Sequence, residues 1–366
     1  MRKEIYSKST KILYRLRLML ERVDHSWKKY VATKMSRDAA NNLRKQVVAH
    51  TGKTVVDKKM RSEIKAYCAE VLGDASYWPW LAYYAELRGE FKKGWMPDDY
   101  YRFKFLPKMN PEKYMRFSEA KAIDHKLFNG AVVDPFFTRT NGQYYHKDGT
   151  VLKQEELDQI LQEVNDEIII KPDSGRGGQG IIFTHPDELH FEKLPKSTDL
   201  IFQPVVQQHP ELQKLYPHSV NTLRVLTLLD DEGTIQVKFI IIRFGREGSR
   251  VDNASRGGGW VFVNIDGTVH PTAFDSIGLE IGKRHPDTGM LYSDLKLPFL
   301  PAIISLCKSV HHSFPYTRVI GWDIFVNEQE EPKIIEWNAN NPFFDIIEAR
   351  FGPFFSEYVL GDDNKR

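Results

Sequence analysis

The sequence of 366 residues contains only two cysteines, Cys68 and Cys307, and no long hydrophobic run. Two thiols cannot build a disulfide framework or a four-cysteine zinc site, so we expect a protein of the reducing cytoplasm. No apolar stretch approaches the roughly 18 residues that a membrane-spanning helix needs. Low-complexity tracts are also missing, and 41% of the residues are hydrophobic, which indicates a globular chain with more than one lobe.

The net charge of the chain is only +2, but positive charge is concentrated at the N-terminus. Residues 1–34 contain ten Lys or Arg and three Asp or Glu, a net charge of +7, so the remainder carries −5. Five apolar residues recur there at helical spacing, namely Ile12, Leu16, Met19, Val23 and Trp27. We expect this stripe to pack against later helices of the same protein. The alternative is contact with an anionic membrane surface or an acidic polymer.

Hydrophobic periodicity predicts an α+β fold in which a helical region precedes strand-rich lobes. The helical region covers residues 1–95, with helices at 57–73 and 79–91. The expected parts that follow are a linker lobe at 96–165, a small lobe at 166–205 and a large lobe at 206–366. Within them we expect a helix that begins at 117 and ends at Asn129-Gly130, a hairpin at 136–152, a helix at 153–164 and one late helix at 299–314.

A glycine-rich loop stands out in the segment "EIIIKPDSGRGGQGIIF" at 167–183, which spells G-x-G-x-x-G at Gly175, Gly177 and Gly180. A dinucleotide-binding loop would lead into a helix, whereas a strand-like "GIIFT" follows here. A P-loop would end in Gly-Lys-Ser or Gly-Lys-Thr, which is not found. The pattern that remains is a loop between two antiparallel strands, with Lys171 on the first of them. Such a loop can cover a triphosphate with backbone N–H groups while the lysine supplies a charge.

Two carboxylates lie on apolar strands near the C-terminus, where an unpaired charge is costly. Asp323 belongs to "GWDIF", and Glu336 belongs to "IIEWNANNP". Strand alternation predicts that Ile334, Glu336 and Asn338 point the same way. Oxygen atoms from Asp323, Glu336 and Asn338 would suit Mg²⁺ that bridges phosphates.

In this combination and order, the sequence resembles the ATP-grasp superfamily over residues 117–355. "AIDHKLFN", "IIIKPDSGRGGQGI" and "IFQPVV" resemble its nucleotide-binding segments, and "GWDIF" with "IIEWNANNP" resembles its metal strands. "HSVNTLRVLT" and "RFGREGSRVDNASRGGG" are most similar to the sugar-transfer-associated ATP-grasp group. The resemblance implies two α/β lobes that clamp ATP. It implies these nucleotide-binding residues: Lys126, Lys171, Ser174, Gly175, Gly177, Gly178, Gln203, Val205 and Val206, with Glu211 as a candidate for the ribose contact.

The resemblance also implies a reaction, the ATP- and Mg²⁺-dependent joining of a carboxylate to an amine through an acylphosphate. Arg224, Arg243, Arg256 and Asn221 would hold the acyl carboxylate or the γ-phosphate. The group suggests a uronic-acid-bearing saccharide, free or carrier-linked, and an amino acid or amine, in polysaccharide biosynthesis. No nucleic-acid partner is expected. The alternatives are a kinase of the same architecture that phosphorylates a hydroxyl, and a non-catalytic nucleotide-binding scaffold.

Overall fold

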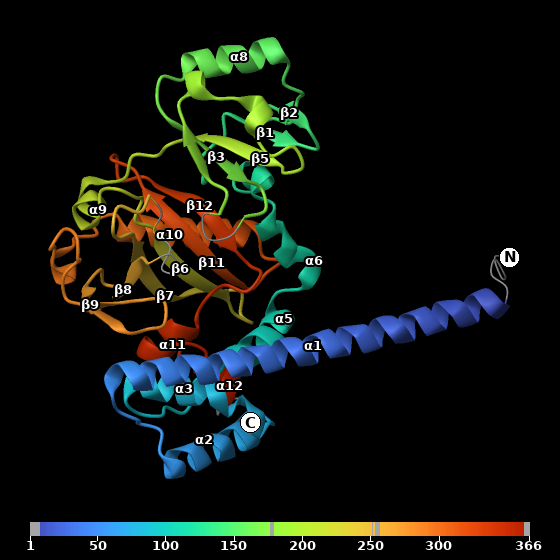
Figure 1. The fold of residues 1–366 in the computed structure, drawn as a ribbon, viewed down its shortest axis with the longest axis vertical. Coiled ribbons are helices and arrows are strands. Elements are labelled where there is room, and N and C mark those ends of the chain that lie inside the picture. The colour runs from blue at the N-terminus through green and yellow to red at the C-terminus, as the bar shows by residue number, and fades with distance from the viewer. Residues whose placement is uncertain (1–7, 176–178, 251, 253–256, 362–366) are drawn as a thin grey trace. The chain divides into compact units, whose positions relative to one another are not determined.

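The computed structural model describes residues 8–175, 179–250, 252 and 257–361, and it describes side chains from residue 26 onward. The chain divides into two compact units (Figure 1). Unit 1 combines residues 1–105 with residues 344–366, and unit 2 comprises residues 106–343. The sequence-based boundaries differ from this division, because the structure returns the last segment of the expected large lobe to the helical unit.

The regular secondary structure of unit 1, among its described residues, is entirely helical. Its helices are α1 (Lys8–Thr51), α2 (Lys58–Val71), α3 (Trp78–Arg88), α4 (Asp98–Tyr100), α11 (Asp345–Phe351) and α12 (Ser356–Leu360). The N-cap Asp57 starts α2 by accepting a 2.7 Å hydrogen bond from the N–H of Met60. Pro79 in the first turn begins α3, and Gly89 with φ +89° ends it. The helices predicted at 57–73 and 79–91 are thereby confirmed.

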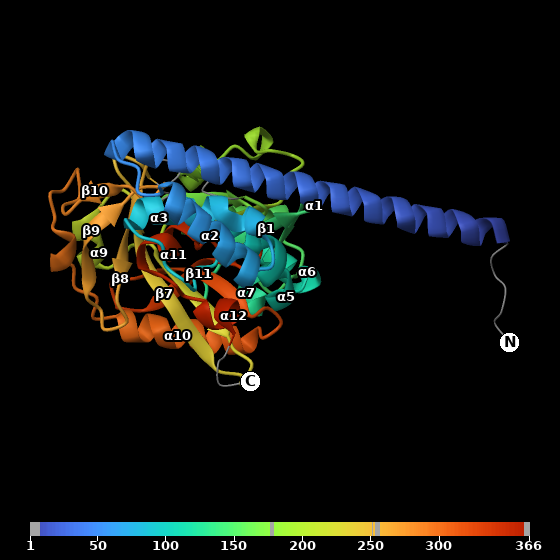
Figure 2. The ribbon, with the colours of Figure 1, turned by 90° about the horizontal axis from the view of Figure 1, so that it is seen from below.

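Helix α3 is the centre of unit 1, because nearly all of its side chains are buried. The C-terminal half of α1 runs beside α3 (Figure 2), and Ala40 and Val47 are buried on that half. Arg44 reaches Glu86 of α3, with 2.9 Å between Nε and the carboxylate oxygen. Helix α11 packs on α3 as well. The sequence did not predict α11 and α12, which follow the polar "NANNP" segment.

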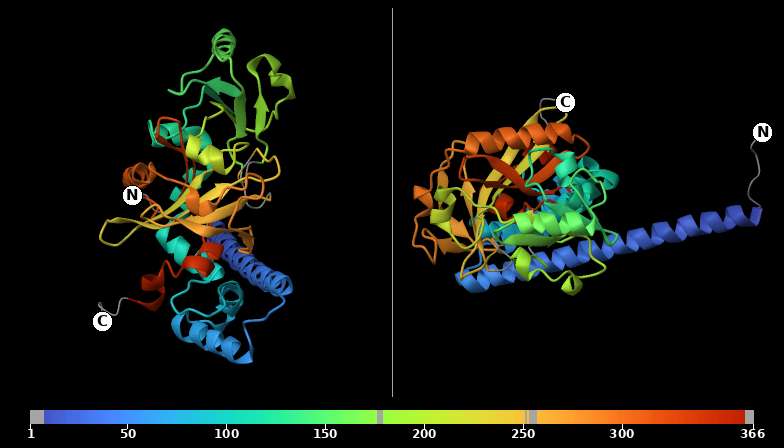
Figure 3. Two further views of the ribbon diagram at one scale, coloured as in Figure 1. Left: turned by 90° about the vertical axis from the view of Figure 1, so that its left-hand side faces the viewer. Right: turned by 90° about the horizontal axis from the view of Figure 1, so that it is seen from above.

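The smaller of the two sheets in unit 2 has five antiparallel strands in the order β2-β1-β5-β3-β4 (Figure 3). They are β1 (Phe137–Thr140), β2 (Gln143–Tyr145), β3 (Ile168–Pro172), β4 (Ile182–Thr184) and β5 (Leu200–Pro204). The predicted hairpin is confirmed, since Asn141 and Gly142 adopt φ of 52° and 77° between β1 and β2. Helix α8 (Gln154–Glu163) is also confirmed. Because β1 and β2 belong to this sheet, the small lobe begins about thirty residues before the predicted boundary at 166.

The larger sheet has seven antiparallel strands in the order β10-β9-β8-β7-β6-β11-β12. They are β6 (Leu223–Leu229), β7 (Ile235–Phe244), β8 (Gly259–Val263), β9 (Val269–Phe274), β10 (Glu280–Gly282), β11 (Val319–Val326) and β12 (Pro332–Asn338). Helix α10 (Leu300–Ser313) packs on β6, β7, β11 and β12 and confirms the predicted late helix. Helix α9 (Pro210–Leu215) lies in the connection from β5 to β6. The α+β fold class is confirmed.

The helix predicted from residue 117 is largely absent. The short helices α5 (Leu106–Met109), α6 (Glu112–Met115) and α7 (Asp124–Leu127) alternate here with 3₁₀ turns. Side-chain bonds to distant parts of unit 2 replace the helical pattern. Ser118 Oγ accepts from the N–H of Ala339 at 3.1 Å, and the N–H of Ala122 donates to Asp173 at 2.7 Å. Tertiary contacts therefore decide the backbone in this segment.

Candidate functional site

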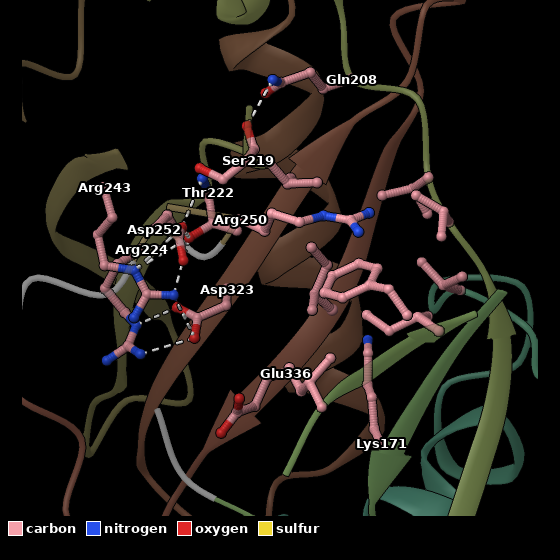
Figure 4. Close-up of a pocket in the computed structure, with 18 of the residues that line it drawn as sticks. Lys171, Gln208, Ser219, Thr222, Arg224, Arg243, Arg250, Asp252, Asp323 and Glu336 are labelled. Atoms are coloured by element: carbon pink, nitrogen blue, oxygen red, sulfur yellow. Dashed lines mark hydrogen bonds and ion pairs between the residues drawn. The ribbon is translucent and has the colours of Figure 1, made fainter. Parts of the chain in front are cut away.

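A cavity of about 480 Å³ in unit 2 is lined by residues of both sheets (Figure 4). One part of its wall is apolar and the other carries charged and polar groups. The apolar residues are Val133, Ile169, Ile181, Phe183, Pro204, Val205, Val206, Ile335 and Phe343. The charged residues are Lys171, Arg224, Arg243, Arg250, Asp252, Asp323 and Glu336. An apolar wall beside a few convergent polar groups is the usual composition of a ligand site.

Lys171 extends from β3 into this cavity, as the sequence predicts (Figure 4). Burial lowers its pKa to about 8, and the nearby positive charge of Lys121 acts in the same direction. The carboxylate of Glu336 opposes the shift. Lys171 is therefore a cation that keeps its charge at neutral pH in a setting that calls for an anionic partner.

Lys121, which the sequence analysis missed, occupies the place expected for Lys126. Its Nζ lies 3.6 Å from Glu336 Oε2 and donates a 2.5 Å hydrogen bond to the carbonyl oxygen of Gly175. Lys126 instead lies beside Gly149. It lines neither the main cavity nor the hollow beside the glycine-rich loop. Separate short helical turns between residues 116 and 127 set the directions of the two lysines. A continuous helix would also have placed them on different faces.

The glycine-rich loop joins the antiparallel strands β3 and β4, as predicted. Ser174, Gly175 and Gly180 line a second hollow of about 670 Å³, which shares Glu336 and Asn338 with the main cavity. Gly180 has φ +73°, and a Cβ there would lie 2.8 Å from Pro172 Cγ, so a glycine is required. Gly177 and Gly178 lie outside the described residues.

The nucleotide-binding residues predicted in the segment "IFQPVV" and at Glu211 do not all reach the main cavity. Val205 and Val206 line the main cavity, as the resemblance implies. Gln203 does not line it, since its Nε2 donates to the carbonyl oxygen of Val133 at 2.6 Å. Glu211 lies on α9, forms an ion pair with Lys214 and also does not line the cavity. The structure therefore gives Gln203 a structural hydrogen bond and leaves Glu211 away from the cavity.

Three charged side chains from neighbouring strands meet at the polar wall. Arg224 holds both oxygens of Asp323, with 2.8 Å from Nη2 to Oδ2, and Arg243 Nη2 lies 3.0 Å from the same oxygen (Figure 4). Burial alone would raise the pKa of Asp323, but the two guanidinium groups outweigh it and hold that pKa below its usual value. Asp252 lies 3.7 Å from Arg243 and accepts a hydrogen bond from the N–H of Thr222 at 3.0 Å.

The three predicted metal ligands share one face of the sheet. Asp323 is the cross-strand partner of Glu336, and Asn338 lies two residues farther along β12. All three line the main cavity. Ile334, however, points into the core, which corrects the predicted alternation, because a register shift leaves Ile335 as an extra residue next to Glu336.

Their availability to a cation differs. Asp323 has both oxygens engaged by arginines, whereas Glu336 forms an ion pair, within the described part of the chain, with Lys121 alone, at 3.6 Å. Asn338 Nδ2 is buried and, among the described residues, lacks a hydrogen-bond partner. An orphaned buried amide is costly unless a ligand completes it. Within the described chain, no three His, Cys, Asp or Glu side chains form a metal cluster of their own.

Asn221 does not line the cavity but is fully buried beneath it. Its Nδ2 donates to Gln208 Oε1 at 2.9 Å and to the carbonyl oxygen of Tyr216 at 2.7 Å. These bonds fasten the connection from β5 to β6, so the structure gives Asn221 a positioning role in place of the predicted substrate contact. Arg256 lies outside the described residues.

Two further residues were missed by the sequence analysis. Arg250 from the segment after β7 lies over the ring of Phe183 on β4, with 3.7 Å to its centroid, and bonds Glu167 at 3.0 Å. Asp124 accepts a 2.8 Å hydrogen bond from Trp337 Nε1, and burial raises its pKa to about 8. No short-range pattern identifies either residue, because both depend on partners more than 60 residues away.

Comparison with known proteins gives a family-model match over part of the chain. Residues 190–350 match the family model described as sugar-transfer associated ATP-grasp, which confirms the resemblance over that segment. The comparison with curated proteins gave no match.

The matches among solved structures include three enzymes. They are a biotin carboxylase from Campylobacter jejuni (12% identity, 69% of this chain, 47% of that chain, TM-score 0.40), an N5-carboxyaminoimidazole ribonucleotide synthetase from Thermotoga maritima (12%, 68%, 50%, 0.40) and the ATP-grasp ligase PsnB (14%, 69%, 62%, 0.39). The chain spans about half the length of the first two. Similarity at this level identifies no substrate for this chain.

Proposed function

Because residues 190–350 match the sugar-transfer associated ATP-grasp family, we propose that this protein is an ATP-dependent ligase that joins a carboxylate to an amine. The observation that carries the proposal is the convergence in one cavity of a lysine, two arginines, a carboxylate and an amide beside an apolar wall. Cations for phosphate, oxygen donors for a hard metal and an apolar surface for a base are together the requirements of a nucleotide-dependent phosphoryl transfer.

The nucleotide would bind with its base against the apolar wall, next to Val205 and Val206, and with its phosphates toward Lys171 and Lys121. Arg250 lies over Phe183 at the side of this wall and would limit access of water to the base. The loop at Ser174 and Gly175 offers backbone N–H groups on the phosphate side. These contacts would orient the γ-phosphate toward the arginines.

Magnesium would be held by the carboxylate of Glu336 and the amide oxygen of Asn338, since both residues line the cavity. The Asn338 Nδ2, which lacks a partner among the described residues, would instead donate to a phosphate oxygen. When bound, the ion would neutralise charge on the phosphate oxygens. Asp323 would contribute mainly by fixing Arg224 and Arg243, since both of its oxygens bind them. Asp323 would bind the ion itself only if Arg224 or Arg243 turned away from it toward the substrate.

The proposed reaction has two steps. A carboxylate oxygen of the substrate attacks the γ-phosphorus of ATP, and the bond to the leaving ADP breaks. The amine then attacks the acyl carbon, loses a proton, and inorganic phosphate leaves with the former carboxylate oxygen. Arg224 and Arg243 are placed to bind the negative charge that both steps develop.

The family description supports a saccharide as one substrate. We therefore propose a uronic-acid-bearing saccharide, free or attached to a carrier, as the carboxylate, and an amino acid or simple amine as the acceptor. The polar wall around Thr222, Ser219 and Arg243 provides hydroxyl and guanidinium groups that suit the hydroxyls and the carboxylate of such a sugar.

A screen for ADP release, with uronic acids crossed against amino acids, would find the substrates. The decisive measurement labels the substrate carboxylate with ¹⁸O and analyses the released phosphate. The ligase puts one labelled oxygen into phosphate for each turnover. A kinase would leave the carboxylate label in place and give a phosphorylated saccharide, and a scaffold would release no ADP.

A further inference from the structure

Helix α1 is 44 residues long, yet only its C-terminal half is built into unit 1. Ser36 accepts a 3.0 Å hydrogen bond from Trp80 Nε1, Arg37 bonds Asp99 at 2.7 Å, and Arg44 bonds Glu86. Toward the N-terminus the exposure changes abruptly, and residues 26–30 are all exposed. The described side chains before Ser36, at 26–35, therefore present a surface that α3 does not bury, and those of Ile12, Leu16, Met19 and Val23 lie outside the described part.

This exposed surface carries aromatic side chains. Trp27 is 64% exposed and Tyr30 is 60% exposed, and their rings lie 5.8 Å apart. Met35 is 67% exposed. The expectation that Trp27 packs against later helices is thus wrong, because α1 extends beyond the end of the helix it packs against. Large exposed apolar groups in a cluster indicate a binding surface.

Between residues 26 and 35 every charged residue is a lysine, whereas Glu21 and Asp24 stand in the two turns before the cluster. Lys28, Lys29 and Lys34 are exposed beside the two aromatic residues. In the sequence of the preceding turns, Arg15, Arg22 and Lys29 recur on one side of the apolar stripe, and Arg17 and Lys28 recur on the other. This pattern disfavours a coiled coil with a second copy, because the flanking positions of two such helices would bring like charges together.

We propose that the N-terminal half of α1 binds an anionic lipid surface. Basic side chains on both sides of an apolar stripe can reach phosphate groups while the stripe lies among the acyl chains, and Trp and Tyr favour that boundary. None of the described helices has the length and apolar character to cross the bilayer, so this contact is peripheral. The concentration of +7 in residues 1–34, against −5 in the remainder, directs the protein to the membrane through this helix.

Sedimentation of the full chain with vesicles tests the proposal. Vesicles of phosphatidylcholine with 30% phosphatidylserine should bind the protein, and vesicles of phosphatidylcholine alone should bind it weakly. Replacing Lys28 and Lys29 by glutamate removes two cations near the surface, so affinity should fall at least about thirtyfold. The matched control replaces Lys58 and Lys59, two exposed lysines of α2, by glutamate and should bind as the wild type does.

A second variant, Trp27→Ala with Tyr30→Ala, separates lipid from other anions. It should lose about tenfold or more in vesicle affinity while its binding to heparin stays unchanged. Equal losses in both charge-reversal variants, or full vesicle binding by the Trp27 and Tyr30 variant, would overturn the proposal. So would a concentration-dependent dimer that these same substitutions dissociate, which would identify a second copy as the occupant.

Discussion

Arg224 and Asp323 face each other across β6 and β11, and the guanidinium holds the carboxylate through two hydrogen bonds. Arg243 on β7 approaches the same carboxylate at 3.0 Å from the next strand. The carboxylate of Asp323 is thus shared by two guanidinium groups. The guanidinium of Arg243 can still bind an anionic substrate. This relationship separates the role of Asp323 from that of Glu336, its cross-strand neighbour.

Asp323→Asn should destabilise the protein strongly. The substitution keeps the shape but removes the counter-charge of the buried Arg224 and one of the two carboxylates beside the half-buried Arg243, and breaking such a buried pair typically costs about 3–5 kcal/mol. The free energy of unfolding in urea measures the effect. Asp252→Asn is the matched control, because its carboxylate lies farther from Arg243, at 3.7 Å, and a much smaller loss is expected. Equal stability of the two variants would contradict the assignment.

Glu336→Gln should have the opposite profile. Glu336 has no guanidinium partner among the described residues and lies 3.6 Å from Lys121 at a partly exposed position, so the free energy of unfolding should change little. Turnover should collapse more than nucleotide binding does, because the variant removes one charge from the metal site. Steady-state kinetics at saturating Mg²⁺ measure this. Retention of most of the turnover would remove Glu336 from the metal site.

Lys121→Ala and Lys171→Ala should each weaken ADP binding by about one to two decades, since each removes one charge-assisted phosphate contact of roughly 1.5–3 kcal/mol. Titration calorimetry measures the affinity, and thermal unfolding checks the fold. Lys126→Ala serves as the control because it deletes the same side chain five residues away, outside the cavity. A loss confined to Lys126→Ala would restore the original sequence-based assignment.

Nucleotide affinity should fall as pH rises above about 8. Burial, with help from Lys121, lowers the pKa of Lys171 to about 8, so the free protein loses this cation above that pH. Bound phosphates favour the charged form, and binding therefore takes up a proton, with affinity falling by up to tenfold per pH unit. Calorimetry between pH 7 and 9.5 in two buffers of different ionisation enthalpy detects the uptake.

Lys171→Arg gives the matching control for this pH dependence. A guanidinium remains charged throughout that range, so the decline should disappear even if the affinity itself is lower. Identical pH slopes in the two proteins would assign the titration to another group.

The sequence predicted most strongly where local pattern and tertiary environment agree. Residue types that favour the observed conformation mark three features. They are the glycine loop between β3 and β4, the hairpin at Asn141-Gly142, and the strands β11 and β12. Lys171 and Glu336 were predicted as site residues because a charge on an apolar strand is costly unless it has a partner or a function, and both line the cavity.

Prediction failed where contacts distant in sequence decide the outcome. The spacing does not distinguish Lys121 from Lys126, and the bonds of Ser118 and Ala122 to remote partners help to hold Lys121 beside Gly175 and Glu336. Ile334 points inward because of a one-residue shift in register, which strand alternation does not reveal. The spacing of Trp27 also suits a buried stripe. Its side chain is exposed because α1 extends beyond the end of the helix against which it packs.

The construction of unit 1 from both ends of the described chain has a consequence for biosynthesis. Helix α3 emerges from the ribosome early, but α11 packs against it, Arg88 bonds the carbonyl of Arg350, and Tyr101 and Phe344 stack with 4.1 Å between their centroids. All of unit 2 must be translated before these partners exist. The first helices of the protein therefore gain their last partners late, and until then the aromatic side chains of α3 remain available for premature association.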